Sequence, residues 1–280
     1  IYADIGSLSA MENFGCEMYF ATEAGLSDTV FLLWSTTPTV MLGKYQNALE
    51  EIDRTYVEKQ GITVIRRMSG GGTIYTDPGG LQFSYIVPDS SPSIDFAAFV
   101  TPVTRALSAM GLDAAADGRN DILVSGKKVS GNAQYKIKGA TVHHGSLLFD
   151  TDLSALTRAT TPKPYKITSK SIASVRDRVT NIREHLPHDM SLAAFRSVLL
   201  LALCGSTEPY PLTDEVRERI RVLGQEHYGA SVWETGPKYE ITKICHLPGG
   251  TMEFALSMKN GRSEEHTSEL QSLPNLVCRL

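Results

Sequence analysis

The feature that most constrains the fold is a run of three glycines, 70–72, that follows two arginines and lies between β-branched segments. Residues 62–65 and 73–75 are typical of strands, so the glycines connect strand to strand and not strand to helix. Such a loop permits close backbone approach, and its N–H groups can form an anion-binding concavity. An arginine at its mouth would add a planar fork. A plain glycine hairpin with surface arginines fits the segment equally well.

The glycine loop matches neither of the common nucleotide signatures. It has no Gly-Lys-Ser/Thr ending, and it lacks the strand–loop–helix setting of a dinucleotide fingerprint. The loop therefore points to an ATP site built on a mixed sheet.

A second segment, residues 118–135, predicts a hairpin. Residues 122–124 form a short buried-strand candidate, 125–127 favour a turn, and Lys128 begins the return strand. A lysine flanked by small residues can reach into a cleft as a point charge. On the hairpin alone, a solvated lysine is the better interpretation.

A third segment, residues 142–150, predicts a strand with His143 and His144 at its head. Adjacent strand residues point to opposite faces, which makes the two histidines a poor metal pair. We expect one histidine to face the functional site and the other to face solvent or a loop.

Taken together, these segments resemble the lipoate–protein ligase family. The motifs that carry the resemblance stand in the family's order at residues 66–77, 118–121, 128–131 and 143–148, with flanking matches at 43–47 and 174–181. The resemblance covers about residues 16 to 261, and four ordered motifs make it specific. The family usually has a histidine where this chain has Thr76, so any contact of that histidine is not carried over.

The resemblance implies that lipoate and ATP give lipoyl-AMP and pyrophosphate, and that the lipoyl group then passes to a lysine of an acceptor domain. Such chemistry needs in-line positioning and neutralised charge, not a protein nucleophile. Lys128 and Arg67 would be the catalytic residues. The implied ATP-binding residues are Arg67, Gly72, Thr73, Ile74, Tyr75 and Lys128. The implied lipoate-binding residues are Gly71, Gly72, Lys128 and His144.

Magnesium would accompany the phosphates, because Mg²⁺ is commonly held by one or two carboxylates together with phosphate oxygens. The candidate ligand is Asp121, with Asn120 beside it. A turn in which these side chains cap their own backbone is an equally good interpretation.

The pattern of strands, helices and hairpins predicts an α+β fold with mixed and antiparallel sheets flanked by helices. This agrees with a biotin/lipoate ligase-like catalytic domain over residues 1–240. We expect strands at 30–34, 39–42 and 81–87, and helices at 50–60, 93–110, 192–203 and 214–223. Residues 18–25 resemble the helix that opens the family's catalytic domain. Residues 160–170, rich in proline, lysine and threonine, predict a mobile loop.

The C-terminal part divides into two stretches. Residues 241–261 resemble the first strands of a small accessory domain, which in relatives closes over the site during adenylation. Residues 262–280 resemble a translated sequencing adapter. We expect this tail to be non-native and the accessory domain to be truncated, so that the chain would transfer lipoyl from lipoyl-AMP yet adenylate poorly.

Composition narrows the class of protein. The chain has 280 residues and a net charge of −4, which argues against a nucleic-acid binder. No apolar run is long enough to span a bilayer, and no signal-peptide pattern opens the chain. The cysteines at 16, 204, 245 and 278 lack metal spacing and fit a reducing cytoplasm. We therefore expect a cytoplasmic enzyme.

Three alternatives remain beside a complete ligase. A lipoyltransferase would use only preformed lipoyl-AMP. An octanoyltransferase would carry the acyl group on a cysteine, but no cysteine lies between Cys16 and Cys204, where the motifs stand. A non-catalytic lipoate- or nucleotide-binding module is disfavoured by the intact Arg67, glycine loop and Lys128. The expected acceptors are the lipoyl domains of 2-oxo acid dehydrogenase complexes and the glycine-cleavage H protein.

Overall fold

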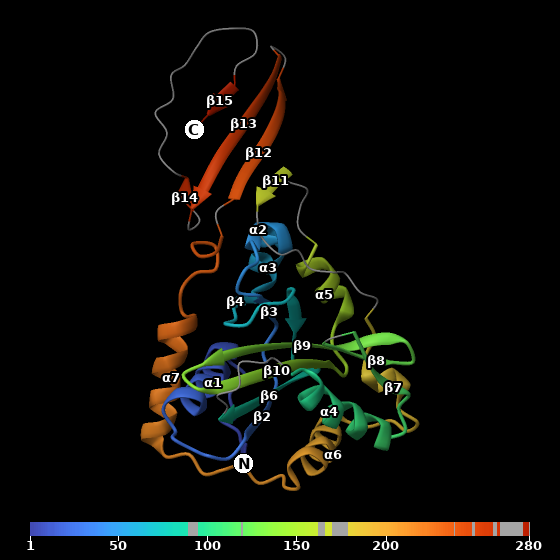
Figure 1. The fold of residues 1–280 in the computed structure, drawn as a ribbon. Helices are drawn as coiled ribbons and strands as arrows, with labels where there is room; N and C mark the ends of the chain where they lie inside the picture. The colour runs from blue at the N-terminus through green and yellow to red at the C-terminus, as the bar shows by residue number, and fades with distance from the viewer. Residues whose placement is uncertain are drawn as a thin grey trace.

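The structure is a computed structural model that describes most of the chain. The described residues are 1–88, 95–118, 120–161, 166–169, 179–237, 239–247, 250–259, 262–263 and 277–279. Figure 1 shows a larger body of sheets and helices, with a small sheet of long strands at one end of it. In the described part of the chain, every helix is too short or too polar to cross a membrane.

The larger body is built on a seven-stranded sheet of order β1-β2-β6-β10-β9-β8-β7. Its neighbours pair antiparallel except β1 and β2, which are parallel. The long hairpin of β9 and β10 crosses the body and carries two of the sequence motifs (Figure 1). The strands are β1 (Tyr2–Ala3), β2 (Val30–Trp34), β6 (Gly80–Pro88), β7 (Ala114–Asp117), β8 (Asp121–Val124), β9 (Lys127–Ile137) and β10 (Ala140–Leu148).

A three-stranded sheet of order β4-β3-β5 carries the glycine loop. Its strands are β3 (Thr39–Leu42), β4 (Thr63–Arg66) and β5 (Ile74–Thr76). β3 pairs parallel with β4 and antiparallel with β5. The glycines therefore connect two strands that flank β3, which confirms the predicted strand-to-strand connection.

Seven α-helices and one 3-10 helix are described, and most α-helices begin at a side-chain cap. Ser9, Asp53 and Asp152 each accept a hydrogen bond from an N–H in the first turn of the following helix, as N-cap residues do. The helices are α1 (Ala10–Thr22), α2 (Ala48–Glu51), α3 (Arg54–Gln60), α4 (Ala97–Ala109), α5 (Leu153–Ala159), η1 (Ile182–His185), α6 (Leu192–Cys204) and α7 (Asp214–Tyr228).

Several helix predictions differ from the structure in their bounds. The helix expected at 93–110 begins at Ala97, and the one expected at 214–223 continues to Tyr228. The helix expected at 18–25 begins earlier, at Ala10, because Ser9 caps it. The helix expected at 50–60 is two helices, because Asp53 takes an extended conformation and caps α3. The predicted end at Gly61 is confirmed, with this glycine in the left-handed conformation.

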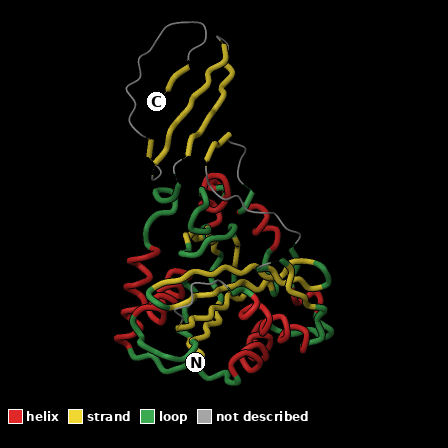
Figure 2. Tube along the Cα trace, in the orientation of Figure 1, coloured by secondary structure: helices red, strands yellow, loops and turns green. Residues whose placement is uncertain are grey.

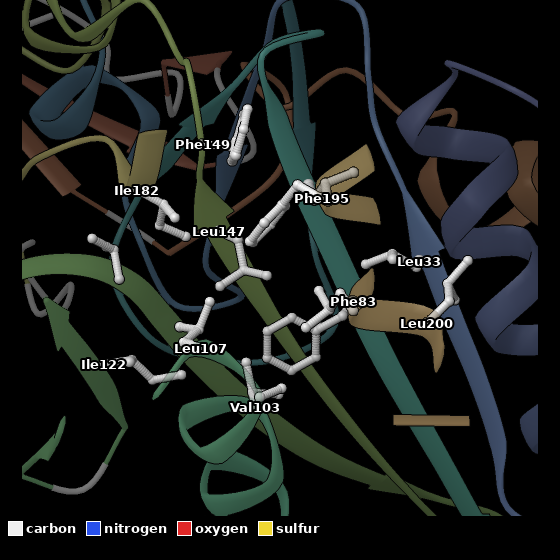
Figure 3. Close-up of a cluster of buried hydrophobic side chains, with 14 of the residues drawn as sticks. Leu33, Phe83, Val103, Leu107, Ile122, Leu147, Phe149, Ile182, Phe195 and Leu200 are labelled. Carbon is white, nitrogen blue, oxygen red and sulfur yellow. The ribbon is translucent and has the colours of Figure 1, made fainter. Parts of the chain in front are cut away.

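The core follows the alternation of strand residues between the two faces of the main sheet. Phe31 and Leu33 of β2 pack with Phe83 and with α4 and α6 in one cluster, part of which Figure 3 shows around Leu107 and Phe195. The intervening residues of β2 pack with α1 and α7 in a second cluster. Helices on both faces of mixed sheets confirm the predicted α+β class.

The small sheet at the end of the molecule is centred on the antiparallel hairpin of β12 (Tyr239–Leu247) and β13 (Gly250–Lys259). In Figure 2 the described residues of this small sheet are all drawn as strands. Two short strands, β14 (Arg262–Ser263) and β15 (Val277–Arg279), pair with β13. Parts of the stretch expected to be a non-native tail are thus hydrogen-bonded to this sheet, and the division at residues 240 and 261 stays a prediction.

The segment expected to be a mobile loop contributes a strand to this small sheet. Residues 166–169 form β11, which pairs antiparallel with β12. The expectation of a loop is therefore wrong for these residues, because β12, which is distant in sequence, supplies a partner for this edge strand. Residues 162–165 and 170 of this segment, Arg119, and residues 174–178 of the last motif lie outside the described residues.

Candidate active site

Two adjoining cavities lie between the glycine loop and the β9–β10 hairpin. The first has a volume of about 400 Å³ and reaches an apolar wall of Phe14, Trp34 and Met41. The second, of about 280 Å³, reaches α5. Lining residues common to both are Thr73, Ile74, Lys128, Gly131 and Ser146. A ligand with an apolar part and a second polar part could therefore occupy both cavities at once.

The buried guanidinium of Arg67 organises the glycine loop from beneath. Its Nη2 donates to the carbonyl oxygens of Gly70 (2.9 Å) and Gly72 (2.6 Å). Its Nη1 donates to Met41 O at 2.8 Å, and its Nε to Ser69 Oγ at 3.0 Å. Burial lowers the pKa of Arg67 to about 10. Arg67 also lines the first cavity, but its fork mainly holds loop carbonyls and does not project freely at the mouth.

His144 joins the glycine loop to helix α1. Its Nε2 lies 2.6 Å from Ser69 Oγ, and its Nδ1 lies 3.1 and 3.2 Å from the two carboxylate oxygens of Glu17. Ser84 Oγ and the Tyr135 hydroxyl also donate to Glu17, at 2.5 and 3.5 Å. The buried carboxylate is thus hydrogen-bonded from three sides, as a buried charge requires.

Lys128 stands at the junction of the two cavities. Its Nζ lies 3.0 Å from Asp121 Oδ2, and both side chains are 23% exposed. Asp121 Oδ1 is buried and has no hydrogen-bond partner among the described residues. The Asn120 amide donates to Asn132 O across the hairpin, at 2.9 Å. Asn120 therefore joins two strands of the hairpin by a hydrogen bond. The Oδ1 atom of Asp121 is left as an oxygen that a ligand could contact.

The residues implied by the family resemblance lie around these two cavities. His144 and Asp121 line the first cavity with the glycine loop, and Tyr75 lines the second. Burial raises the pKa of Tyr75 to about 12. The residues that the structure brings together are Arg67, Gly71, Gly72, Thr73, Ile74, Tyr75, Asp121, Lys128 and His144.

Several known proteins are similar to this chain in sequence. The model of the lipoyl protein ligase A/B catalytic domain matches residues 9–204. Lipoate–protein ligase 1 of Staphylococcus aureus is 37% identical over 257 residues, which cover 90% of this chain and 78% of the relative. A lipoate–protein ligase of Bacillus subtilis is 38% identical and covers 90% and 79%. The chain belongs to the lipoate–protein ligase family. The predictions of family and of ligase activity are confirmed.

Solved structures agree with the fold of this ligase. The crystal structure of a lipoate–protein ligase A bound with ATP is 25% identical, with a TM-score of 0.65, and the match covers 80% of this chain and 93% of that one. A bipartite lipoate–protein ligase from Thermoplasma acidophilum is 24% identical, with a TM-score of 0.67, and the match covers 83% and 94%.

Sequence reasoning gave no role to several residues that shape the site of the ligase, although Gln46 and Ser69 stand within the matched segments 43–47 and 66–77. Gln46, fully buried, accepts hydrogen bonds from Gly43 N and Thr73 Oγ1, both at 2.9 Å, and so ties one loop to the other. Glu17 and Ser69 were likewise given no role. A signal for Glu17 was available, because it stands among apolar residues of an apolar helix. The residues of the apolar wall carry no such signal, because an apolar residue that lines a cavity cannot be told from a core residue in the sequence.

The expectation for the two histidines is half wrong. His144 faces the first cavity, but His143 faces neither solvent nor a loop. It is fully buried and stacks on Phe99, with ring centroids 4.6 Å apart. Burial lowers its pKa to about 3. The reason is that α4 covers the sheet face opposite the cavity, which strand alternation alone does not reveal.

The two cysteines of the ligase whose side chains are described, Cys16 and Cys204, do not support a role as acyl carrier. Cys16 is buried in the cluster between α1 and the sheet, and burial raises the pKa of its thiol. Burial also raises the pKa of Cys204. Neither thiol lines the two cavities in the part of the chain that the structure describes. Neither of these two described thiols is therefore placed to act as the thiolate nucleophile that an octanoyltransferase working through a cysteine needs.

Proposed function

We propose that this ligase joins lipoate to ATP as lipoyl-AMP at the junction of the two cavities, and then transfers the lipoyl group to a lysine of an acceptor domain. The observation that carries the proposal is the position of Lys128, which lines both cavities. The apolar wall of Phe14, Trp34 and Met41 suits the dithiolane and alkyl chain of lipoate. The carboxylate would then lie near Lys128, with the nucleotide along residues 72–75.

In the first step, a carboxylate oxygen of lipoate attacks the α-phosphorus and pyrophosphate leaves. Both reactants are anions, so a cation between them lowers their repulsion and favours in-line approach. Lys128 supplies that charge, and its ion pair with Asp121 holds it at the junction before substrate arrives. Arg67 supplies a second charge from beneath the glycine loop, while its hydrogen bonds fix the backbone that holds the nucleotide.

In the second step, the amine of the acceptor lysine attacks the lipoyl carbonyl, an amide forms, and AMP leaves. Negative charge develops on the carbonyl oxygen in the transition state. Lys128 can remain beside that oxygen and stabilise it, as preorganised donors do. No protein nucleophile is needed in either step.

Magnesium fits this proposal as a companion of the phosphates. The described residues contain no group of three metal-ligating side chains, so phosphate oxygens would have to complete the coordination. The partnerless Oδ1 of Asp121 is an oxygen of the kind that Mg²⁺ prefers, and one carboxylate with phosphates suffices for this ion. Bound there, magnesium would neutralise phosphate charge.

The proposed acceptors are the lipoyl domains of 2-oxo acid dehydrogenase complexes and the glycine-cleavage H protein. The Thermoplasma structure of similar fold is described together with the E2 lipoyl domain of its own system. We place the reaction in the cytoplasm, since Cys16 and Cys204 are free thiols, as a reducing compartment allows.

The test is lipoate-dependent ATP–pyrophosphate exchange, run beside transfer from synthetic lipoyl-AMP to an apo lipoyl domain. Exchange together with transfer supports the complete ligase. Transfer without exchange would indicate a lipoyltransferase that uses preformed lipoyl-AMP. Activity in neither assay would contradict the proposal and favour a binding module. Repeating the assays with octanoate decides which acyl chain the first cavity prefers.

A further inference from the structure

A chain of buried hydrogen bonds runs from helix α1 to the glycine loop. It begins at the Glu17 carboxylate, passes through His144 and Ser69, and ends at the guanidinium of Arg67. Glu17 and Ser69 are both 0% exposed. Glu17 lines neither cavity, although it lies at the start of this chain.

One assignment of donors and acceptors gives every group in this series of hydrogen bonds a partner. Arg67 Nε can only donate, so Ser69 Oγ accepts from it. The Glu17 carboxylate accepts, so His144 Nδ1 carries the proton that faces it. Ser69 can then donate its hydroxyl proton to His144 Nε2, and every group in the chain has a partner. This assignment follows from satisfying the network as a whole.

The serine–histidine–carboxylate order resembles a hydrolytic triad, but the geometry argues against that role. A nucleophilic serine must reach its substrate, whereas Ser69 is fully buried and lines neither cavity. Its oxygen is also occupied by the Arg67 N–H. The chain therefore orients groups and does not attack substrate.

What the chain orients is the glycine loop. The guanidinium holds the carbonyl oxygens of Gly70 and Gly72, so the shape of the loop depends on the position of Arg67. We infer that Glu17 is a positioning residue for the nucleotide site, which acts through His144 and Ser69 to hold Arg67 beneath the loop. The inference rests on the proposed nucleotide role of this loop.

The test compares four single variants of the full chain. Glu17→Leu removes the acceptor, and Ser69→Ala removes the link between His144 and Arg67. Glu17→Gln keeps an amide oxygen that can accept from His144 and Ser84. The matched control is Ser84→Ala, which removes a buried hydroxyl that donates to Glu17 but lies outside the path to Arg67.

Two measurements report on the loop without catalysis. Hydrogen exchange of the amides in residues 66–76 should be about tenfold faster in Glu17→Leu and in Ser69→Ala, as the loss of one buried hydrogen bond to a charged group predicts. It should be unchanged in Glu17→Gln and Ser84→Ala. The ¹⁵N chemical shifts of His144 should show the proton on Nδ1 in the wild-type protein and its loss from Nδ1 in Glu17→Leu.

Kinetics give the third measurement. The KM for ATP should rise about tenfold in Glu17→Leu and Ser69→Ala, and the double variant should be no worse than either single one, because both break the same chain. Unchanged loop exchange in both variants would overturn the inference, as would equal damage from Glu17→Gln or Ser84→Ala. If the wild-type protein lacked ATP-dependent activity, the proposed function would fail, and loop exchange would still decide the role of Glu17.

Discussion

At the scale of single residues, Lys128 lies at the junction of the two cavities, and its side chain is only partly buried. Its side chain is 23% exposed and pairs with Asp121, and such partly exposed ion pairs stabilise proteins by only about 0–1 kcal/mol. Lys128→Ala should therefore change the free energy of unfolding in urea very little. It should lower lipoate ligation about 10²- to 10³-fold, because it removes a donor that stabilises the transition state. The control is Lys127→Ala, at the exposed neighbouring position. Near wild-type ligation by Lys128→Ala would refute the assigned role.

Arg67 presents the opposite case, because it is buried and makes four hydrogen bonds within its own loop and β3. A lysine cannot reproduce that planar fork. Arg67→Lys should lower the free energy of unfolding by about 3 kcal/mol and also impair ligation. Urea unfolding checks this, with Arg54→Lys in an exposed helical ion pair as the control. Equal stability of the two variants would contradict the structural role of Arg67.

His143 should make the stability of the protein depend on pH. Burial lowers its folded-state pKa to about 3, from the ordinary 6.5. Between these values the unfolded chain binds a proton that the folded chain does not, so the free energy of unfolding falls as pH falls, by about 1.4 kcal/mol per pH unit. His143→Gln should reduce that slope in urea unfolding between pH 6.5 and pH 4. The exposed His188→Gln provides the control for removing a histidine. An unaltered slope in His143→Gln would contradict the assignment.

At the scale of elements, the loop after β3 crosses the glycine loop at close range. A Cβ on Gly43 would overlap the carbonyl oxygen of Gly71, whereas a Cβ on Gly70 would meet only the Tyr45 ring, at 3.8 Å. Gly43→Ala should therefore lower the free energy of unfolding by about 2–3 kcal/mol, and Gly70→Ala should be tolerated. Thermal unfolding of the two variants compares them directly. Similar melting temperatures would show that the loops do not need this close approach.

The elements also show what the sequence can predict. Local patterns predicted β2, β3, β6 and the glycine connection, because strand alternation and turn chemistry are local. The division of α2 from α3 was missed, although Asp53 carries the capping signal. The pairing of β11 with β12 could not be foreseen, since the partner strand lies about seventy residues further along the chain. Glu17 and Arg67 are likewise joined only by tertiary contacts. The motifs supplied residues that line the cavities, but they did not reveal this link.

At the scale of the whole molecule, the small sheet is connected to the larger body at two places. The linker before β12 is one, where Arg66 Nη2 donates to Thr235 O at 3.2 Å and Arg54 lies over the Trp233 ring at 4.9 Å. The strand β11 is the other. The described core clusters extend no further along the chain than Trp233. The larger body therefore holds its own core.

This arrangement predicts that removing the small sheet impairs the ATP-dependent step more than it lowers the stability of the fold. Thr160, Thr161 and Val179 line the second cavity, and β11 lies between them in sequence and pairs with β12. A chain that ends at residue 237 should unfold within a few degrees of the full protein, since the described core is intact. It should lose ATP–pyrophosphate exchange more than transfer from lipoyl-AMP, because β11 loses its partner strand. Thermal unfolding and the two assays decide this. If the shortened protein folds but loses both activities equally, the sheet acts on neither step selectively. If the shortened chain does not fold, the sheet contributes to the stability of the larger body.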